Sequence, residues 1–390
     1  MKIVHMADSH LGFSAYGRVD RWGRNLREEM VYQGFSKTVD KIIDLAPDAV
    51  VHAGDVFHHV RPRIRPLYVF QQNLERLVEA GIPVVIISGN HDAPKSYASL
   101  SPFTLFEGME GVHIAHHYRY EPFEVGETTF HTIPFCLGPE DYLEEFRKMQ
   151  EGRAETSGGK DVLVMHGLVE ALWDRRLRTV GEHQLKESFL KSDFSYIALG
   201  HYHGQAQVAK NGWYSGSVEY FRFNEAKDEK GFLYVDLDTD PGSVKQIKIQ
   251  DEYMIDLEPI DCIGLSSREV EGLIGSVCDD LGLKDKIVRL RLSEISREAY
   301  RSLSRRLLGE LRGEALHIEI IPEFSDEPAP RETEPMESRD LPQEFRKFIE
   351  GEAAGEAIPA AIRDGVLAYG TGLLARISEK RATERFDAAQ

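Results

Sequence analysis

The feature that most constrains this fold is a series of polar clusters, each of which directly follows a short apolar run. In chain order the clusters are Asp8-Ser9-His10, Gly54-Asp55, Gly89-Asn90-His91-Asp92, His166-Gly167, Gly200-His201-Tyr202-His203 and Tyr214-Ser215-Gly216-Ser217. Apolar runs of four to six residues are typical of buried strands. Between them, apolar residues recur at spacings of three and four, which favours helices. The pattern predicts an α/β fold whose functional residues lie on loops at the carboxyl ends of strands.

The polar clusters contain the side chains that bind a pair of divalent cations. The candidate ligands are Asp8, His10, Asp55, Asn90, His166, His201 and His203. Asp8 and His10 are two residues apart, so in an extended segment both side chains point toward one ion. His201 and His203 repeat this spacing and can provide one imidazole to each cation. Asp55 has two carboxylate oxygens and is the expected bridge between them.

The chemistry of these ligands indicates a phosphoesterase. A mixed set of oxygen and imidazole ligands suits Mn²⁺, Fe²⁺ or Zn²⁺ better than Ca²⁺ or Mg²⁺ alone. Two such cations about 4 Å apart stabilise the attacking and leaving oxygens of an in-line displacement at phosphorus and activate a water. His91 adjoins a ligand, and we expect it to contact the phosphate oxygens or to protonate the leaving group. Asp92 either supports the ligand loop or is an ordinary loop carboxylate.

Composition sets the size and setting of the protein. A chain of 390 residues with 42% hydrophobic residues predicts two or three domains with a packed core. The net charge of −18 argues against a surface coated in phosphate-binding charge. It does not exclude nucleic acid, because bound cations add local positive charge. Three scattered cysteines, no signal peptide and no membrane-spanning apolar run predict a cytoplasmic protein without disulfides.

Four segments follow from the patterns. Residues 1–250 carry the clusters, and residues 251–323 form a smaller α/β module without one. In that module we expect a helix with an apolar stripe at Val270, Leu273, Ile274 and Val277, and another that carries Leu303, Leu307, Leu308 and Leu311. Residues 324–340 are rich in proline and acidic residues and are expected to be a linker, since they cannot bury a core.

Residues 341–390 are expected to form two amphipathic helical stretches behind the linker. The second carries Ile362, Val366, Tyr369, Leu373 and Ile377 at spacings of three and four. Gly365, Gly370 and Gly372 weaken this helix by roughly 1 kcal/mol each relative to alanine. Such a segment is unstable alone. It either docks in a groove of a partner or packs back on its own protein.

The clusters resemble those of the calcineurin-like metallophosphoesterases. Within that group they are most similar to the double-strand-break repair nucleases called Mre-eleven in archaea and eukaryotes and SbcD in bacteria. Gly54-Asp55-Val56-Phe57-His58 followed by Arg61-Pro62 has the form typical of this nuclease branch, whereas phosphatases of the fold carry Gly-Asp-x-Val-Asp-Arg-Gly. The resemblance spans nearly the whole chain, and the length resembles that of archaeal members. It implies a two-sheet sandwich flanked by helices, with a capping domain at 251–323 that binds DNA and C-terminal helices that dock on an ATPase.

The resemblance also implies roles for individual residues. One metal would be held by Asp8, His10, Asp55 and His203, and the other by Asp55, Asn90, His166 and His201. His91 resembles the histidine that acts on the transition state, and His58 resembles a second active-site histidine associated with duplex end processing. The implied cofactor is two Mn²⁺ per subunit, with Fe²⁺ or Mg²⁺ as physiological alternatives. The implied reactions are 3′ to 5′ exonuclease on duplex DNA and endonuclease on single strands or hairpins.

The implied partners are DNA, a second copy of the chain and a coiled-coil ATPase of the Rad-fifty or SbcC type, in a nucleoid-associated complex. Basic and aromatic loops at 18–24, 61–65, 95–97 and 116–120 either track phosphates or are ordinary solvated loops. The resemblance implies dimerisation through helices at 67–77 and 97–106, whose apolar residues serve either a dimer interface or the core. Two other readings of the function are a phosphodiesterase or phosphatase for small substrates, and a DNA-tethering scaffold subunit whose nuclease is incidental.

Overall fold

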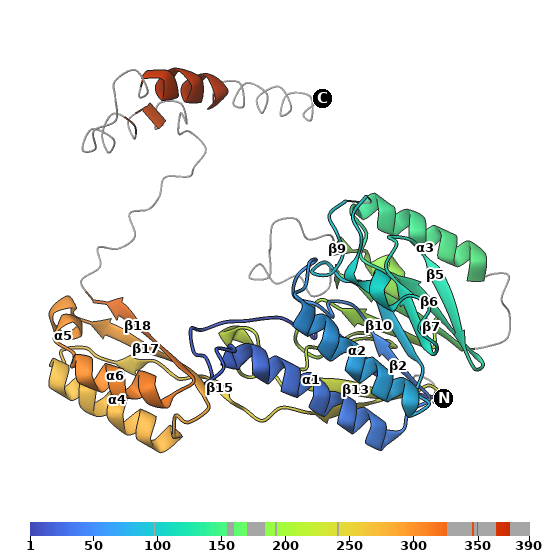
Figure 1. Ribbon diagram of the computed structural model, residues 1–390. Coiled ribbons are helices and arrows are strands. Elements are labelled where there is room, and N and C mark those ends of the chain that lie inside the picture. The colour runs from blue at the N-terminus through green and yellow to red at the C-terminus, as the bar shows by residue number, and fades with distance from the viewer. Residues whose placement is uncertain are drawn as a thin grey trace. The chain divides into compact units, whose positions relative to one another are not determined.

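The computed structural model describes residues 1–96, 98–153, 160–169, 184–191, 193–239, 242–325, 345–346, 349 and 364–374. The chain divides into two compact units, Met1–Ser325 and Asp326–Gln390. None of the described helices combines the length and the apolar character that a membrane crossing requires. Figure 1 shows the order of the elements along the chain.

The first sheet has six strands in the order β14-β13-β1-β2-β3-β4. Their bounds are β1 (Lys2–Met6), β2 (Ala49–His52), β3 (Val84–Ile87), β4 (Val112–Ala115), β13 (Gly231–Asp236) and β14 (Ser243–Lys248). Strands β1 to β4 are parallel to one another, whereas β13 pairs antiparallel with β1 and with β14. The carboxyl ends of the four parallel strands therefore meet at one edge of this sheet.

The second sheet also has six strands, in the order β11-β12-β10-β7-β6-β5. Their bounds are β5 (Glu121–Val125), β6 (Thr128–Ile133), β7 (Lys160–His166), β10 (Tyr196–Gly200), β11 (Ala206–Ala209) and β12 (Gly212–Tyr214). Its four central strands are parallel, and an antiparallel strand lies at each side. The short strands β8 (Leu168–Val169) and β9 (Gln184–Leu185) pair separately.

The two sheets pack face to face and helices cover their outer faces (Figure 1). An apolar layer between the sheets contains Val51 and Val85 from the first and Val162 and Val164 from the second. The helices on the first sheet are α1 (Leu26–Leu45) and α2 (Ile64–Glu79), and those on the second are α3 (Pro139–Arg153) and the 3₁₀ helix η4 (Glu187–Lys191). This arrangement confirms the predicted two-sheet sandwich flanked by helices.

The segment after β14 contains a third sheet, with strands β15 (Met254–Asp256), β16 (Ile260–Asp261), β17 (Ile287–Ile295) and β18 (His317–Phe324). Its helices are α4 (Ser267–Leu281), α5 (Arg297–Arg301) and α6 (Arg305–Glu314). We refer to residues 254–324 as the cap module. It contacts the rest of its unit through a stacked pair of rings, Tyr16 and His317, and through the Arg18 guanidinium, which donates to the Gly313 carbonyl at 2.6 Å.

Three sequence expectations for helices need correction. In α4 the buried residues are Val270, Ile274 and Cys278, which are spaced by four. Leu273 lies beside the buried side of the helix and is 42% exposed. The expected second helix is interrupted. Ser304 accepts a hydrogen bond from the Leu307 backbone and begins a new helix, so Leu303 lies between α5 and α6. The helix expected at 97–106 is only a short 3₁₀ helix, η1 (Pro102–Phe106), and Tyr97 lies outside the described residues.

The C-terminal unit is described only in part. Residues 364–374 form a helix, in which Val366, Tyr369 and Leu373 are exposed. The predicted linker lies outside the described residues apart from Phe324 and Ser325, and so does the rest of 341–390 apart from residues 345–346 and 349.

Candidate metal centre

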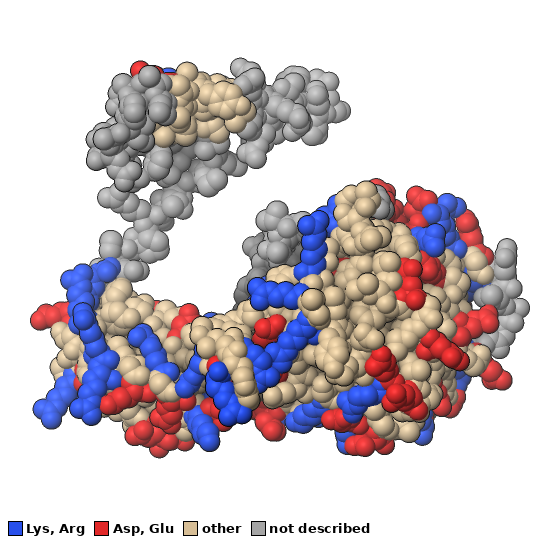
Figure 2. All heavy atoms as spheres, in the orientation of Figure 1, with Lys and Arg blue, Asp and Glu red and all other residues tan. Residues whose placement is uncertain are grey.

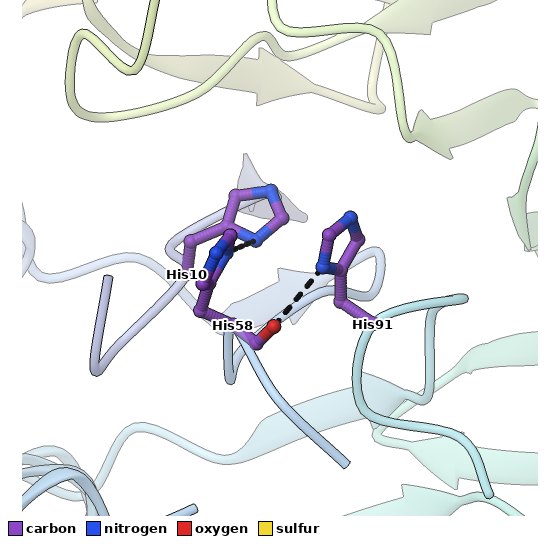
Figure 3. A group of neighbouring side chains, drawn as sticks. All are labelled: His10, His58 and His91. Carbon is purple, nitrogen blue, oxygen red and sulfur yellow. Dashed lines mark hydrogen bonds between the residues drawn. The ribbon is translucent and has the colours of Figure 1, made fainter. Parts of the chain in front are cut away.

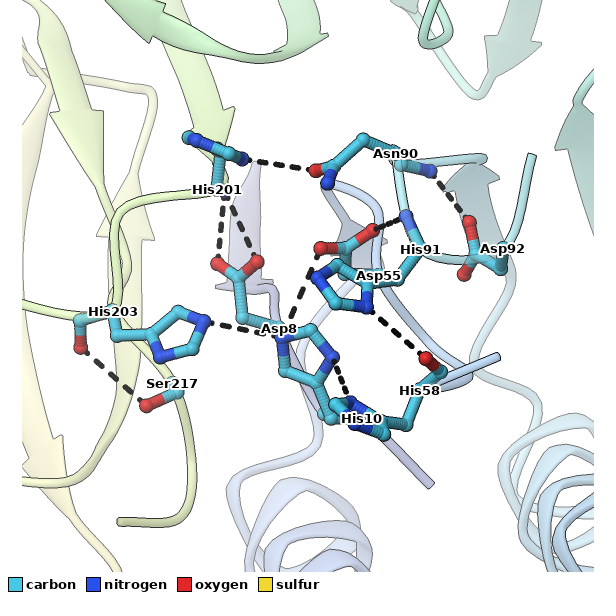
Figure 4. A network of polar contacts seen from close by, with 12 residues as sticks. Asp8, His10, Asp55, His58, Asn90, His91, Asp92, His201, His203 and Ser217 are labelled. Carbon is cyan, nitrogen blue, oxygen red and sulfur yellow. Dashed lines mark hydrogen bonds and ion pairs between the residues drawn. The ribbon is translucent and has the colours of Figure 1, made fainter. Parts of the chain in front are cut away.

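The polar clusters converge where the strands of both sheets end (Figure 4). Asp8 follows β1, Asp55 follows β2 and Asn90 follows β3 in the first sheet. From the second sheet, His166 is the last residue of β7 and His201 follows β10. Because the parallel strands run to the same end of the sandwich, clusters that are up to 193 residues apart in the chain come within hydrogen-bond distance.

The backbone at this edge adopts a conformation that ordinary residues avoid. Four candidate ligands have positive φ angles: Asp8 at 52°, His10 at 44°, Asp55 at 56° and His201 at 99°. Such conformations cost of order 1–3 kcal/mol each and persist when the surrounding structure and a function require them. Gly89 is needed for a related reason, because a Cβ there would overlap the Asp55 carboxylate.

The first group of candidate ligands comprises Asp8, His10 and His203, whose ligating atoms all lie within 4.8 Å of one another. The Nε2 atoms of His10 and His203 are 3.1 Å apart, and His10 Nε2 is 3.8 Å from Asp55 Oδ2. Ligand atoms about 3–4 Å apart can each lie near 2 Å from one central cation. Asp8 also accepts hydrogen bonds from the His201 backbone amide at 3.0 and 3.1 Å, which fixes its carboxylate.

The second group contains Asp55, Asn90, His166 and His201. Asn90 Oδ1 lies 3.0 Å from His166 Nε2 and 2.9 Å from His201 Nδ1, and His166 Nε2 lies 3.4 Å from Asp55 Oδ2. The same oxygen of Asp55 therefore approaches both groups, a position that suits a bridging carboxylate. Two imidazole-rich groups that share one carboxylate oxygen fit a pair of divalent cations, and all seven predicted ligands lie in this one place.

The electrostatics of the edge reflect close packing of ionisable groups. Burial raises the pKa of Asp8, although neighbouring imidazoles, first His166, oppose the shift. Burial also opposes ionisation of Asp55, but the adjacent His166 holds the pKa of Asp55 well below its usual range. The pKa of His10 is lowered well below its ordinary value by burial. A neutral imidazole and an ionised carboxylate are the forms that bind metal.

The ring nitrogens that face away from the centre are held by hydrogen bonds. His166 Nδ1 donates to the Ala53 carbonyl at 2.8 Å, and His203 Nδ1 donates to Glu225 Oε1 at 2.8 Å. Each bond leaves Nε2 as the atom that could bind a cation. A carboxylate or carbonyl behind a ligating histidine is a general feature of metal sites. Glu225 is in turn paired with the fully buried Lys230 at 2.9 Å.

Sequence reasoning did not identify Glu225 or Lys230 as part of this site. Neither follows an apolar strand run in a polar cluster, and Glu225 belongs to a short 3₁₀ helix, η5 (Phe223–Glu225). No local pattern marks them. The one clue was that Lys230 directly precedes the apolar segment that forms β13. A lysine is rarely buried unless it is paired with another group.

Beside the ligands lie two further histidines, His58 and His91 (Figure 3). His91 Nδ1 donates to the His58 carbonyl at 3.0 Å, and the two rings stack with centroids 5.1 Å apart. The His91 backbone amide donates to Asp55 Oδ1 at 2.8 Å, so His91 lies directly next to the carboxylate that approaches both groups. Burial and the neighbouring His91 lower the pKa of His58 to about 4, which makes it neutral at pH 7.

Asp92 has a structural role at this edge. Its buried carboxylate accepts backbone hydrogen bonds from Val56 at 2.6 Å, Phe57 at 3.2 Å and Gly89 at 2.7 Å. It therefore ties the loop after β2 to the loop after β3, and these two loops carry Asp55 and Asn90. Of the two alternatives left open by the sequence, the structure favours support of the ligand loops.

Residues 1–205 match the sequence family described as calcineurin-like phosphoesterase. The chain belongs to this family, and it is a metal-dependent hydrolase of phosphoesters. Within the family it is similar to archaeal proteins named DNA double-strand break repair protein Mre11. It is 30% identical to the Methanococcus maripaludis protein over 268 residues, which cover 64% of this chain and 67% of that protein.

Two other relatives give similar values. The protein of the same name from Methanocaldococcus jannaschii is 31% identical over 264 residues, covering 64% of this chain and 67% of the relative. That from Sulfurisphaera tokodaii is 29% identical over 267 residues, covering 66% and 65%. A solved dimetal phosphatase from Danio rerio aligns with a TM-score of 0.38 at 11% identity, covering 60% of this chain and 91% of that one. The sequence similarity to the three archaeal proteins confirms the resemblance to the Mre-eleven branch.

Proposed function

We propose that this protein is a manganese-dependent DNA nuclease of double-strand-break repair, with 3′ to 5′ exonuclease activity on duplex ends and endonuclease activity on single strands and hairpins. The observation that carries the proposal is that one oxygen of Asp55, Oδ2, lies near the Nε2 atom of His10 in the first group and near that of His166 in the second. The relatives' name, DNA double-strand break repair protein, supports DNA as the substrate.

In this proposal seven residues hold the cations. One ion is bound by Asp8, His10, Asp55 and His203, and the other by Asp55, Asn90, His166 and His201. When bound, the pair supplies positive charge for the phosphate and its attacking and leaving oxygens. The mixed set of oxygen and nitrogen atoms among the seven ligands supports Mn²⁺, with Fe²⁺ or Mg²⁺ as alternatives.

His91 is the proposed catalytic side chain. Because its Nδ1 is held by the His58 carbonyl, Nε2 is the atom that can donate to a phosphate oxygen or to the leaving group. His58 completes this corner of the site: its own Nδ1 is 3.4 Å from His10 Nδ1, so it both fixes His91 and contacts a proposed ligand. This dual contact supports an active-site role for His58.

Surface charge supports a DNA path across the cap module, the proposed DNA-binding domain, and the adjacent ends of α1 and α2. Figure 2 shows many Lys and Arg side chains on that part of the visible face, interspersed with Asp and Glu, whereas Asp and Glu are more frequent at its opposite end near α3. A pocket of about 140 Å³ beside the site is lined by His59, Arg61 and Arg63 together with Ser14 and Glu28. Guanidinium groups at a pocket on this path suit phosphate contacts.

The activity can be tested with a linear, 3′-labelled duplex incubated with Mn²⁺, Mg²⁺ or EDTA. We expect Mn²⁺-dependent loss of the 3′ label, and loss of roughly 10³-fold or more of this activity in Asp55→Ala, because the metal pair contributes several kcal/mol. Asp40→Asn, an exposed carboxylate on α1, is the matched control. A small chromogenic phosphodiester in the same panel tests the alternative of a small-substrate phosphoesterase, which predicts cleavage of that ester without cleavage of DNA.

We also propose that residues 341–390, within the C-terminal unit, dock on the coiled coil of a Rad-fifty or SbcC-type ATPase. The exposed Val366, Tyr369 and Leu373 form one side of the helix at 364–374 and suit a groove in a partner. Deletion of 341–390 should abolish binding of the ATPase and preserve cleavage of the small phosphodiester. Full binding by the truncated chain would contradict the docking proposal.

A homodimer is proposed for the same complex, which acts at the nucleoid in the cytoplasm. The sequence left open whether the apolar residues at 67–77 and 97–106 serve a dimer interface or the core. Leu74 and Leu77 are buried in the core. On the other side of α2, Ile64 is 85% exposed and Tyr68 56%, and Leu105 on η1 is 69% exposed. Exposed apolar side chains on neighbouring elements support a second copy as the occupant, which the molecular mass in solution tests.

A further inference from the structure

A second set of metal-ligating side chains lies outside the centre described above. Glu107 follows η1, His116 and His117 follow β4, and Glu121 begins β5. The ligating atoms of Glu107, His116 and His117 all lie within 4.8 Å of one another. We propose that these three residues bind a third divalent cation of the zinc type, held independently of the two-metal centre.

The distances around Glu107 support this assignment. Its Oε1 is 2.6 Å from His116 Nε2 and 3.5 Å from His117 Nε2, so one carboxylate oxygen serves both imidazoles. Ligand atoms of a tetrahedral zinc site are about 3.3 Å apart. Glu107 is 44% exposed and has a long side chain that can withdraw from His116 by the short distance required. Two imidazoles and a carboxylate are a common protein ligand set for zinc.

A second carboxylate stands behind one of the imidazoles. His117 Nδ1, the nitrogen away from Glu107, is 3.5 Å from Glu121 Oε1, which also accepts from Arg119 at 3.2 Å. A ligating histidine normally has such an outer acceptor, which fixes the ring and strengthens it as a ligand. His117 thus has the two partners that a metal-bound imidazole needs, at opposite ring nitrogens.

The surrounding fold holds the three ligands in fixed positions. His116 is only 3% exposed, and its ring contacts Phe103 of η1, so it cannot swing away from Glu107. Consecutive residues of an extended chain point to opposite sides. Here the rings of His116 and His117 nevertheless lie 4.0 Å apart, because β4 ends at Ala115 and the chain turns out of the strand direction at 117–119. This turn is what brings both imidazoles to one carboxylate.

A cation at this place would connect η1 with the end of β4, the edge strand of the first sheet, and Glu121 behind His117 would link it to β5, the edge strand of the second sheet. The same turn is joined to the loop after β3 by the Tyr118 hydroxyl, which donates to the Pro94 carbonyl at 2.6 Å. The site is therefore a fastening of the fold next to the loop that carries Asn90, and no catalytic step requires it.

The test is a zinc titration of the metal-free full-length chain, with competition against a chromophoric chelator and a count of bound zinc after gel filtration. Glu107→Gln/His117→Gln changes two half-exposed ligands and should bind one zinc fewer than the wild type. Glu110→Gln/His113→Gln, which alters the same residue types nearby on the loop and on β4, should bind the wild-type number. An equal zinc count in the two double variants would overturn the proposal.

Two further measurements separate this site from the two-metal centre. Glu121→Gln should weaken the third zinc by about 10- to 100-fold, the usual effect of removing an outer acceptor. Unchanged affinity would contradict its assigned position. The Glu107→Gln/His117→Gln protein should keep the Mn²⁺-dependent phosphoesterase activity of the wild type. If it lost that activity together with the zinc, the cluster would belong to the catalytic centre and the proposal of an independent site would be wrong.

Discussion

The edge of the sandwich where the parallel strands end, which we call the carboxyl edge, is built from strands and loops like those of the cap module. The two regions differ in how deeply they bury charged side chains. At the edge, Asp8, Asp55 and Asp92 are nearly or fully buried, and three of the strand-end ligands from β1 and β2 have left-handed backbone. In the cap module, all of which is described, no charged or polar side chain reaches this degree of burial. Its polar residues do the ordinary work of surfaces and helix caps.

The helices of the cap module begin as local rules require. Ser266, Ser296 and Ser304 each accept a hydrogen bond from a backbone amide in the first turn, and Ser266 with Glu269 forms a capping box. Asp285 and Glu294 of the cap module also have left-handed backbone, with φ of 60° and 52°, so the module differs from the edge mainly in having no buried charge. At the carboxyl edge, buried charge and left-handed backbone lower the stability of the fold, which is typical of a functional site. The difference assigns the chemistry to the edge and not to the cap module.

Among residues that are not proposed as ligands, the largest expected effect is at His91. His91→Gln should lower the turnover of phosphodiesters by about 10²- to 10⁴-fold, the range for loss of a positioned proton donor. The Mn²⁺ content should not change, because His91 is adjacent to the ligands without being one. Turnover and bound metal are measured on the same sample, with His113→Gln on β4 as the control. Loss of manganese from the His91 variant would show that the ring is a ligand.

The sequence predicts the ligand clusters better than it predicts the helices of the cap module. The ligand clusters were predictable because each follows a buried strand, and parallel strands bring their carboxyl ends to one edge. The corrected helices of the cap module depended on weaker information. Leu273 and Leu303 fit an apolar stripe, but a serine cap at Ser304 decides where α6 begins, and packing against β17 decides which side of α4 is buried.

The supporting residues of the site were beyond sequence reasoning. The contact of Glu225 with His203 joins residues from different elements, and the buried Lys230 is explained only by its contacts with Glu225 and Asp228. Such pairings depend on the tertiary packing, which no spacing rule encodes. The candidate ligands can therefore be named from the sequence, whereas the groups that orient them require the structure.

Glu225 offers a smaller test of the edge. Glu225→Gln should weaken Mn²⁺ binding by about 10- to 100-fold, because His203 loses the charged acceptor behind its ligating ring. Glu229→Gln, at an exposed carboxylate in the loop that follows η5, should bind Mn²⁺ as the wild type does. The affinities come from titration of the metal-free proteins. If Glu225→Gln unfolded more easily but bound metal normally, the residue would serve only to neutralise Lys230.

The smallest expected effect lies in the cap module, at Asp256. Its carboxylate accepts two hydrogen bonds from the Arg289 guanidinium, at 3.0 and 2.6 Å, and this contact holds the pKa of Asp256 below its usual range. A lowered pKa in the folded state means that the stabilisation is present above the unfolded value of about 3.9 and is lost as the pH falls through the folded value. At pH 7, Asp256→Asn should therefore cost about 1 kcal/mol of cap-module stability.

The stability difference can be measured by hydrogen exchange of the β17 amides at pH 7 and by denaturant titration at pH 7 and pH 3. The gap between Asp256→Asn and the wild type should narrow at pH 3, because the wild-type carboxyl begins to take up its proton there. Glu258→Gln, at a side chain 88% exposed, should have no effect at either pH. Phosphodiester turnover should be unchanged in both variants, since the ion pair stabilises only the module that carries no ligand. A drop in turnover with Asp256→Asn would show that the cap module and the carboxyl edge are coupled, and the separation of their roles would then fail.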